Sequence, residues 1–279
     1  MLELGGQALT LKEIAEIALA KVRLELAPAA IARMEDSRRV VRRVAEEDAP
    51  VYGINTGFGK LCEVRIADDA IDRLQLNLVR SHACGLGRPL SEEETRVVMA
   101  LRANTLALGL SGVRPRIAEM LCAFLNHGVH PVVPQRGSVG ASGDLAPLAH
   151  VALALVGEGE VFLEDRRLPA AIALKSLGMK PLVLEAKEGL SLVNGTQAML
   201  SVGLLALRDA EILADTADVA GALSLDGLRG STRAFDPRLH KARPHPGQMI
   251  SARNLTRLNR GSAINKSHQG CSRVPRSSP

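Results

Sequence analysis

Residues 137–150 read GSVGASGDLAPLAH, and this stretch decides the fold. Gly137, Gly140 and Gly143 recur at every third position, and an apolar pattern typical of a helix follows directly. The stretch matches neither the dinucleotide-binding GxGxxG motif, nor the lysine-containing end of a phosphate-binding loop, nor the GxSxG nucleophile motif. Its glycines alone favour a tight turn that leads into a helix, with Asp144 supporting the N-terminus of that helix.

A second interpretation follows from the chemistry of Ala141-Ser142-Gly143. In a compressed turn, the Gly143 nitrogen can attack the Ala141 carbonyl carbon and close a five-membered ring, because no bulky side chain blocks the approach. Loss of water from this ring and from the serine side chain leaves a methylidene group, which is a strong electrophile. The following helix directs its positive end at the ring oxygen and stabilises negative charge there.

The composition favours a helical, globular chain. Of the 279 residues, 46% are hydrophobic but only 2% are aromatic, so the core is built from aliphatic side chains that suit close-packed helices. Cys62, Cys84, Cys122 and Cys271 form no CxxC pair, which argues against a zinc site and for a reducing, cytoplasmic location. No uncharged apolar run reaches the roughly 18 residues of a membrane span, so no membrane partner is expected.

The positive charge lies in the last part of the chain. The net charge is +5, but residues 231–279 hold ten Lys and Arg residues against the single acid Asp236. Residues 1–230 are therefore net acidic, and the body of the protein is not expected to bind nucleic acid. A basic-tailed nucleic-acid binder stays open as an alternative for the tail alone.

Hydrophobic periodicity predicts the elements. A loop is expected at Pro50–Lys60, and a short β-hairpin is expected near 157–170 with Glu164-Asp165 at its turn. Ser91 and Glu94 resemble a capping box at a helix start. The expected helices cover 11–24, 29–47, 67–81, 91–108, 115–126, 145–156, 196–228 and 249–258.

These elements predict a mainly α fold, with an N-terminal helical and loop domain followed by part of a long-helix bundle. The N-terminal domain is expected at 1–110, and an incomplete central bundle that holds the Ala-Ser-Gly motif at 111–260. Residues 261–279 are polar, basic and aperiodic, which predicts a disordered tail.

Four spaced motifs together resemble one family. YGINTGFG at Tyr52–Gly59, SLVNGTQAM at Ser191–Met199 and FDPRLHKARPHPGQ at Phe235–Gln248 accompany the stretch 137–150 in a fixed order. They resemble the signature motifs of the aromatic amino acid ammonia-lyases, and the similarity runs from near the N-terminus to about Arg273. In that family the triad cyclises into 4-methylideneimidazol-5-one (MIO), so the resemblance implies MIO formed from Ala141-Ser142-Gly143.

The resemblance also implies roles for three further residues. Tyr52 is the base that removes the substrate β-proton, and Asn194 hydrogen-bonds the ring. Ser81-His82 is similar to the histidine-specific branch, where this histidine contacts the substrate imidazole. The residues alone leave other interpretations open: Tyr52 as an anchor at the core edge, Asn194 as a helix N-cap, and His82 as a structural histidine beside a glycine turn.

The implied reaction is the non-oxidative deamination of L-histidine to trans-urocanate and ammonia, the first step of histidine degradation, with no metal. The family works as a cytoplasmic homotetramer whose active sites combine several subunits. Two alternatives remain: a phenylalanine or tyrosine ammonia-lyase or aminomutase that uses the same ring, and a non-catalytic fragment.

The last residues depart from the family pattern. After Cys271–Val274 the family continues with a segment like QDPYSLR, whereas this chain reads PRSSP. We expect a truncation or frameshift after about Val274, which removes the carboxylate-binding arginine and much of the bundle. This chain is therefore predicted to be inactive and not to form the family homotetramer by itself.

Overall fold

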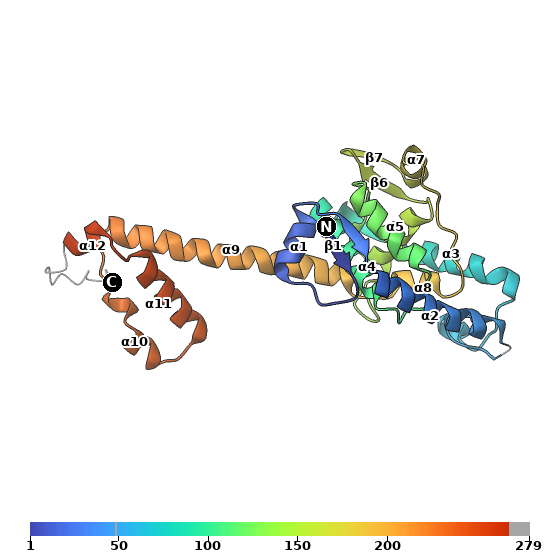
Figure 1. The fold of residues 1–279 in the computed structure, drawn as a ribbon, viewed down its shortest axis with the longest axis horizontal. Coiled ribbons are helices and arrows are strands. Elements are labelled where there is room, and N and C mark those ends of the chain that lie inside the picture. The colour runs from blue at the N-terminus through green and yellow to red at the C-terminus, as the bar shows by residue number, and fades with distance from the viewer. Residues whose placement is uncertain (48, 268–279) are drawn as a thin grey trace. The chain divides into compact units, whose positions relative to one another are not determined.

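The computed structural model describes residues 1–47 and 49–267, which divide into two compact units at Leu205 and Ala206. The first unit is mainly helical, as predicted (Figure 1). Its helices are α1 (Leu11–Ala18), α2 (Pro28–Glu46), α3 (Ile71–His82), α4 (Glu92–Ala107), α5 (Pro115–Asn126), α6 (Leu145–Leu155), α7 (Ala170–Ser176), α8 (Glu188–Val193) and the first part of α9 (Gln197–Gly227), with 3-10 turns at Gly59–Leu61 and Asp68–Ala70.

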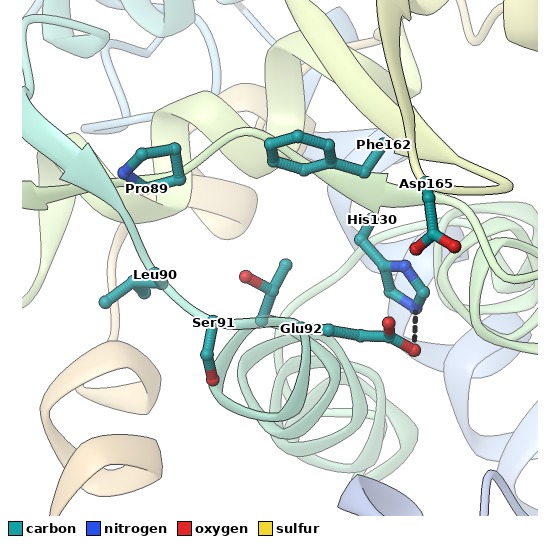
Figure 2. Close-up of a pocket in the computed structure, with 8 residues that line it drawn as sticks. Pro89, Leu90, Ser91, Glu92, His130, Phe162 and Asp165 are labelled. Atoms are coloured by element: carbon teal, nitrogen blue, oxygen red, sulfur yellow. Dashed lines mark ion pairs between the residues drawn. The ribbon is translucent and has the colours of Figure 1, made fainter.

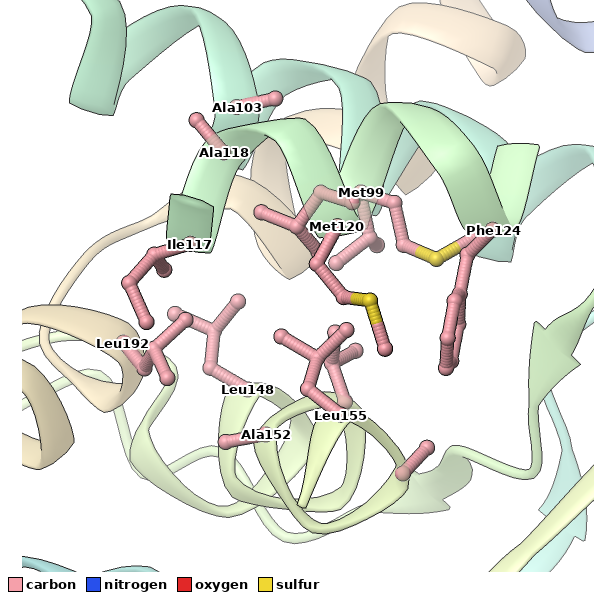
Figure 3. Packing of buried hydrophobic residues seen from close by; sticks show 14 of the residues in the cluster. Met99, Ala103, Ile117, Ala118, Met120, Phe124, Leu148, Ala152, Leu155 and Leu192 are labelled. Atoms are coloured by element: carbon pink, nitrogen blue, oxygen red, sulfur yellow. The ribbon is translucent and has the colours of Figure 1, made fainter. Parts of the chain in front are cut away.

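Helices α4, α5, α6 and α8 enclose the main core (Figure 3). Almost every residue of α4 is buried, because neighbouring helices and strands cover it on all sides. Aliphatic and methionine side chains fill this core, and Phe124 is the one fully buried aromatic side chain among them. The low aromatic content of the sequence is thus matched by a core of small, interdigitating side chains.

The strands form three small sheets. β1 (Leu2–Leu4) pairs in parallel with β2 (Leu24–Leu26), and β3 (Leu86–Pro89) pairs antiparallel with β5 (Pro134–Arg136). The third sheet has the antiparallel order β4 (His130–Pro131), β6 (Glu160–Leu163) and β7 (Arg166–Pro169).

The predicted hairpin is confirmed as β6 and β7. Glu164 and Asp165 connect the strands with φ of 50° and 59°, as a two-residue hairpin turn requires. The predicted capping box of α4 is also confirmed. The Glu94 N–H donates to Ser91 Oγ over 3.1 Å, and the Ser91 N–H donates to Glu94 Oε2 over 2.8 Å.

The helix predicted over 11–24 is shorter in the structure. It ends at Ala18, and Lys21 adopts a φ of 50°, which a right-handed helix does not allow. Leu24–Leu26 then pairs with β1. Helical periodicity of apolar residues did not reveal this pairing, because a three-residue strand carries too little alternation to be read.

The second unit contains the rest of α9, a 3-10 turn at Thr232–Phe235, α10 (Pro237–Lys241), α11 (Pro246–Leu258) and α12 (Ala263–Ser267). Asn254 Nδ2 donates to Asp218 Oδ2 over 2.8 Å and joins α11 to α9. Ser262 Oγ donates to Asp226 Oδ1 over 2.6 Å and accepts from the Asn265 N–H, which caps α12.

Disorder was predicted from residue 261 onward, and α12 contradicts this for residues 263–267, because Ser262 ties that helix to α9. The remainder of the predicted tail, including Val274, lies outside the described residues. The three-part domain division stays a prediction. On either side of its first boundary, α4 and α5 pack in one core.

One helical stretch of the described residues, Glu188–Gly227, is long and apolar enough by composition to cross a membrane. Residues 189–207 hold no charged side chain, but Ser191, Asn194 and Gln197 interrupt the apolar residues there. The core helix of a soluble protein passes the same test, so a single stretch is weak evidence for a membrane span.

Candidate active site

The stretch 137–144 connects β5 to α6 and makes a sharp turn. Gly140 and Gly143 have φ of 67° and 134°, which side-chain-bearing residues rarely adopt. Ala141 and Ser142 are exposed, whereas Gly143 and Asp144 are buried. The serine therefore stands at the surface of a turn whose following residues are fixed in the protein interior.

Gly143 lies against the backbone of Gly195. An ideal Cβ on Gly143 would be 2.6 Å from the Gly195 oxygen and 2.8 Å from its nitrogen. The Asp144 N–H also donates to the Gly195 oxygen over 2.6 Å. No side chain fits at position 143, so the triad is pressed against the segment that holds Asn194.

The Asp144 carboxylate links the motif to α9. It is fully buried and accepts from Ser138 Oγ over 2.6 Å and from the Met199 N–H over 2.8 Å. The expectation that Asp144 supports its own helix was incomplete: it precedes α6 but makes no capping hydrogen bond there. It caps the first turn of α9 instead, where backbone N–H groups are free to donate.

Asn194 ends the short helix α8. Its backbone N–H donates to the Leu190 oxygen over 3.0 Å, and the residue is exposed. Because α9 begins at Gln197, Asn194 does not occupy the position directly before that helix, and the N-cap interpretation is wrong. Its amide is thus left at the surface, beside the Gly195–Gly143 contact.

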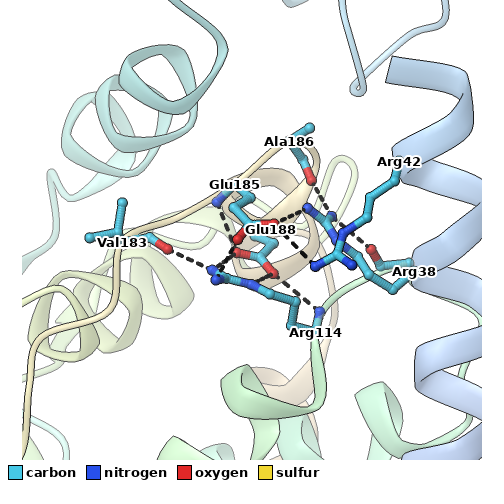
Figure 4. A network of polar contacts seen from close by, with 8 residues as sticks. Arg38, Arg42, Arg114, Val183, Glu185, Ala186 and Glu188 are labelled. Carbon is cyan, nitrogen blue, oxygen red and sulfur yellow. Dashed lines mark hydrogen bonds and ion pairs between the residues drawn. The ribbon is translucent and has the colours of Figure 1, made fainter. Parts of the chain in front are cut away.

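A buried ion-pair network anchors the start of α8 (Figure 4). Glu188 is 0% exposed and accepts from Arg114 Nε over 2.8 Å and from Arg114 Nη2 over 2.7 Å. This carboxylate raises the pKa of Arg114. Arg38 donates to Glu185 Oε2 over 2.6 Å and to the Ala186 oxygen over 2.8 Å, which fixes the segment that leads into α8.

The tyrosine loop lies against the same helix. An ideal Cβ on Gly53 would be 2.5 Å from Leu190 Cδ2, so the loop touches α8 at a residue whose φ of 77° favours glycine. The neighbouring Tyr52 is 55% exposed, and its ring meets Phe58 edge-on at 6.0 Å between centroids. Tyr52 is therefore not a buried anchor of the core.

His82 is the last residue of α3, and its ring is oriented by that helix. Nδ1 lies 2.8 Å from the Leu78 oxygen and 3.1 Å from Ser81 Oγ. A carbonyl oxygen only accepts, so these contacts assign the proton of the neutral ring to Nδ1. The other nitrogen, Nε2, is then an acceptor.

The loop after His82 touches the start of the motif. The Gly85 N–H donates to Nε2 of His150, a residue of α6, over 3.1 Å. Burial lowers the pKa of His150, which favours the neutral ring that can accept this hydrogen bond. An ideal Cβ on Gly137 would be 3.1 Å from Gly85 Cα, so the two loops are in backbone contact.

Within the first unit, glycine contacts and α8 therefore join the segments that hold Tyr52, His82, Ser142 and Asn194. Within the described residues, the side chains of Tyr52, His82, Ser142 and Asn194 make no hydrogen bond to one another. Sequence reasoning missed Arg114 and Glu188, which lie 74 positions apart. No local pattern signals such a distant pair, whereas His150 and Asp144 lie in or beside the quoted motif.

Two cavities of the described part lie away from these residues. One, of about 320 Å³, lies where β3 meets α4 and faces the hairpin (Figure 2). In it, Nε2 of His130 lies 3.6 Å from Oε1 of Glu92. The other, of about 330 Å³, lies beside Gln197 and Leu200 of α9. None of the predicted site residues lines either cavity.

The described residues contain no group of three or more His, Cys, Asp or Glu side chains that could hold a metal ion.

Comparison with known proteins identifies the relatives of this chain. A histidine ammonia-lyase from Koribacter versatilis (strain Ellin345) is 55% identical over 273 residues, which are 98% of this chain and 53% of that protein. The structure of histidine ammonia-lyase from Trypanosoma cruzi is similar with a TM-score of 0.86 and 37% identity, over 96% of this chain and 53% of that one. Tyrosine aminomutase from Streptomyces globisporus gives a TM-score of 0.88 and 36% identity, over 99% and 54%.

The chain spans about half the length of the curated relatives it matches. The aromatic amino acid lyase family matches residues 9–275, which is nearly the whole sequence. With this match and the helical fold that its solved relatives share, the chain belongs to the aromatic amino acid lyase family.

Proposed function

We propose that this chain is the ring-bearing part of a histidine ammonia-lyase, a carbon–nitrogen lyase that converts L-histidine to trans-urocanate and ammonia. The observation that carries the proposal is the contact of Gly143 with the Gly195 backbone, beside an exposed Ser142. It leaves no room for a side chain at position 143, as ring closure in the preceding backbone requires.

The residues of the triad fit an MIO group. The Gly143 nitrogen bonds to the Ala141 carbonyl carbon, and two water molecules leave. One carries away the Ala141 oxygen with the amide hydrogens of Ser142 and Gly143, and the other carries the Ser142 hydroxyl with its Cα hydrogen. The group supplies an electrophile that activates the substrate amino group as a leaving group.

The remaining roles belong to side chains at the edges of this turn. Tyr52 takes the substrate β-proton, and Asn194 donates its amide to the ring. His82 accepts the imidazole N–H of the substrate at Nε2, in keeping with a ring whose Nδ1 is held by the Leu78 oxygen. Exposure of Tyr52 and Asn194 leaves both free to meet a substrate.

Ring formation needs only the first unit in this proposal, because the contacts that fix the triad come from Gly85, Gly195 and Met199. The intact mass of the purified chain tests whether the ring forms. We expect the loss of two waters in the wild type and no loss in Ser142→Ala. A folded wild-type chain with its full mass would refute ring formation.

Turnover by this chain alone is not expected. Apolar residues of α9 are exposed in it, including Leu207, Leu213 and Leu223. In the family, such faces and further substrate ligands belong to a longer chain that forms a homotetramer. Joining residues 1–267 to the C-terminal half of the Koribacter versatilis protein should give urocanate from histidine. A folded, ring-bearing chimera without urocanate would refute the proposed activity.

A phenylalanine or tyrosine lyase or aminomutase is the second candidate, since tyrosine aminomutase is among the similar structures. His82 separates the two. In the chimera, His82→Leu should abolish turnover of histidine. If histidine is not a substrate and His82→Leu leaves turnover of tyrosine or phenylalanine intact, the second candidate is correct.

A cytoplasmic location completes the proposal. The three described cysteines, Cys62, Cys84 and Cys122, are free thiols, as a reducing compartment favours. We propose no metal, nucleic-acid or membrane partner.

A further inference from the structure

Arg102 on α4 is a buried cation without a carboxylate partner among the described residues. It is 3% exposed, its Nη1 donates to Gln197 Oε1 over 3.1 Å, and its Nε has no hydrogen-bond partner. Burial lowers the pKa of Arg102 to about 10, so the guanidinium keeps its charge at neutral pH. An unpaired buried charge of this kind destabilises a fold, which calls for another reason for its presence.

Arg102 lies directly behind the backbone that holds the triad. An ideal Cβ on Gly195 would be 2.4 Å from Arg102 Nη1 and 2.2 Å from Gln197 Oε1. The carbonyl of the same glycine contacts Gly143 and accepts from the Asp144 N–H. A single residue, Gly195, therefore separates the guanidinium from the triad.

The other buried arginine of α4 has a different setting. Arg96 is 0% exposed and donates to the Ile17 oxygen over 2.8 Å and to the Leu125 oxygen over 3.1 Å. These bonds tie α4 to α1 and α5, away from the triad. Arg96 thus serves as an internal comparison for the cost of removing a buried arginine from this helix.

We propose that Arg102 is a positioning residue for ring closure, which with Gln197 holds Gly195 against Gly143. This inference rests on the proposed function and deepens it, because it names what presses the turn together. Gln197 is held in turn by Thr105, whose Oγ1 accepts from Gln197 Nε2 over 3.2 Å. The support therefore runs from α4 through Gln197 to the turn.

The test follows ring closure by intact mass after cell-free synthesis, in the full chain. Arg102→Met should slow the loss of the two waters roughly tenfold or more, since small displacements of reacting groups carry large rate penalties. Arg102→Lys, which keeps the charge and a donor, should restore part of the rate. Arg96→Met is the matched control and should destabilise the fold without slowing closure in the molecules that fold.

Gln197 provides a second pair of variants that leave Arg102 in place. Gln197→Leu removes the acceptor and should slow closure as Arg102→Met does. Gln197→Glu keeps an acceptor of the same shape and should retain most of the rate. Equal rates for Gln197→Leu and the wild type, or equal slowing by Arg96→Met and Arg102→Met in folded molecules, would overturn the proposal.

Amide hydrogen exchange at Asp144 separates this proposal from the proposed function. The N–H of Asp144 bonds to the Gly195 oxygen, so a loosened Gly195 should speed its exchange. We expect faster exchange in Arg102→Met than in Arg96→Met at matched stability. If the wild type loses no water, the proposed function fails, and this exchange rate alone decides the role of Arg102: an unchanged rate refutes it.

Discussion

The two sides of the candidate site differ in burial. On one side, Gly143, Asp144 and Glu188 are buried and closely packed, with backbone and carboxylate contacts that leave no free space. On the other side, Ser142, Asn194 and Tyr52 are exposed. The side chains proposed to carry the chemistry are thus the ones that this chain covers least.

The buried residues hold the turn in place, and the exposed residues are the ones proposed to react. The buried side is complete within the first unit, whereas the exposed side has surface available for a substrate and for further protein. Substitutions on the buried side should therefore change the free energy of unfolding, and those on the exposed side should change chemistry alone. Three predictions test this division, and one further prediction concerns His130, which lies away from the site.

The largest change in stability is expected for Glu188→Ala. Removing this buried carboxylate takes two hydrogen bonds from the Arg114 guanidinium, which keeps only Glu185 and the Val183 oxygen, and should lower the free energy of unfolding by about 4 kcal/mol. Urea denaturation measures the loss. Glu160→Ala, which breaks the exposed pair with Arg167, should cost less than about 1 kcal/mol, and equal losses would contradict the division.

Acid should destabilise the chain through His130, a buried residue that lines the cavity of Figure 2. Burial lowers the pKa of His130 to about 4, against the partial opposition of Glu92 and with help from Arg96. His130 therefore becomes protonated near pH 6.5 in the unfolded chain but only near pH 4 in the folded chain. The stability contributed by the neutral ring is complete above that pH and is lost as the pH falls to about 4.

The expected loss across this window is about 3 kcal/mol. Denaturation at a series of pH values measures it, and His130→Gln should reduce the slope between pH 6.5 and 4 to the part that His150 contributes, because burial lowers the pKa of that residue too. The pKa of Glu92 is also lowered, so its own loss begins only below its ordinary value of 4.5. A slope that persists unchanged in His130→Gln would assign the acid sensitivity elsewhere.

Gly143→Ala should cost about 2 kcal/mol, because the new Cβ meets the Gly195 backbone at a φ that alanine rarely adopts. Gly140→Ala is the control within the same motif: it has a positive φ but nothing within 4 Å of its Cβ position. Thermal unfolding should therefore show a smaller loss for Gly140→Ala. Equal losses of stability in the two variants would mean that the Gly195 contact does not contribute to the cost of Gly143→Ala.

The smallest change in stability is expected for Ser142→Ala. The side chain is exposed, so the free energy of unfolding should stay within about 0.5 kcal/mol of the wild type. The same variant should lose the ability to release the two waters entirely. Unfolding and intact mass, measured on one preparation, check both halves; a marked loss of stability would place Ser142 on the buried side.

The elements with long helical periodicity or a local turn signal could be predicted from sequence. α4 begins at its capping box, and the β6–β7 turn falls at Glu164 and Asp165. The short strand β2 and the end of α1 could not, because pairing with β1 decides them and no local pattern encodes a distant partner. The triad proposed to form the ring was visible as small residues in a glycine-rich turn.

The support of that triad was not visible, since it comes from segments remote in sequence. Asp144 gives no local sign that it caps α9, and Arg102 gives no local sign that it is buried beside Gln197. Sequence alone suggests exposed charges at both positions, whereas both side chains are buried and hydrogen-bonded in the structure. Sequence reasoning therefore names candidate reactive residues more readily than the residues that support them.

The hydrogen bond between Asp144 and Met199 makes the shape of the turn depend on folding of the chain. It spans 55 positions, so the turn acquires its shape only after distant parts of the chain have met. Release of water from the backbone is irreversible, whereas folding is reversible. A chain that has formed the ring would thus have folded at least once, and its lower mass would show this even after later denaturation.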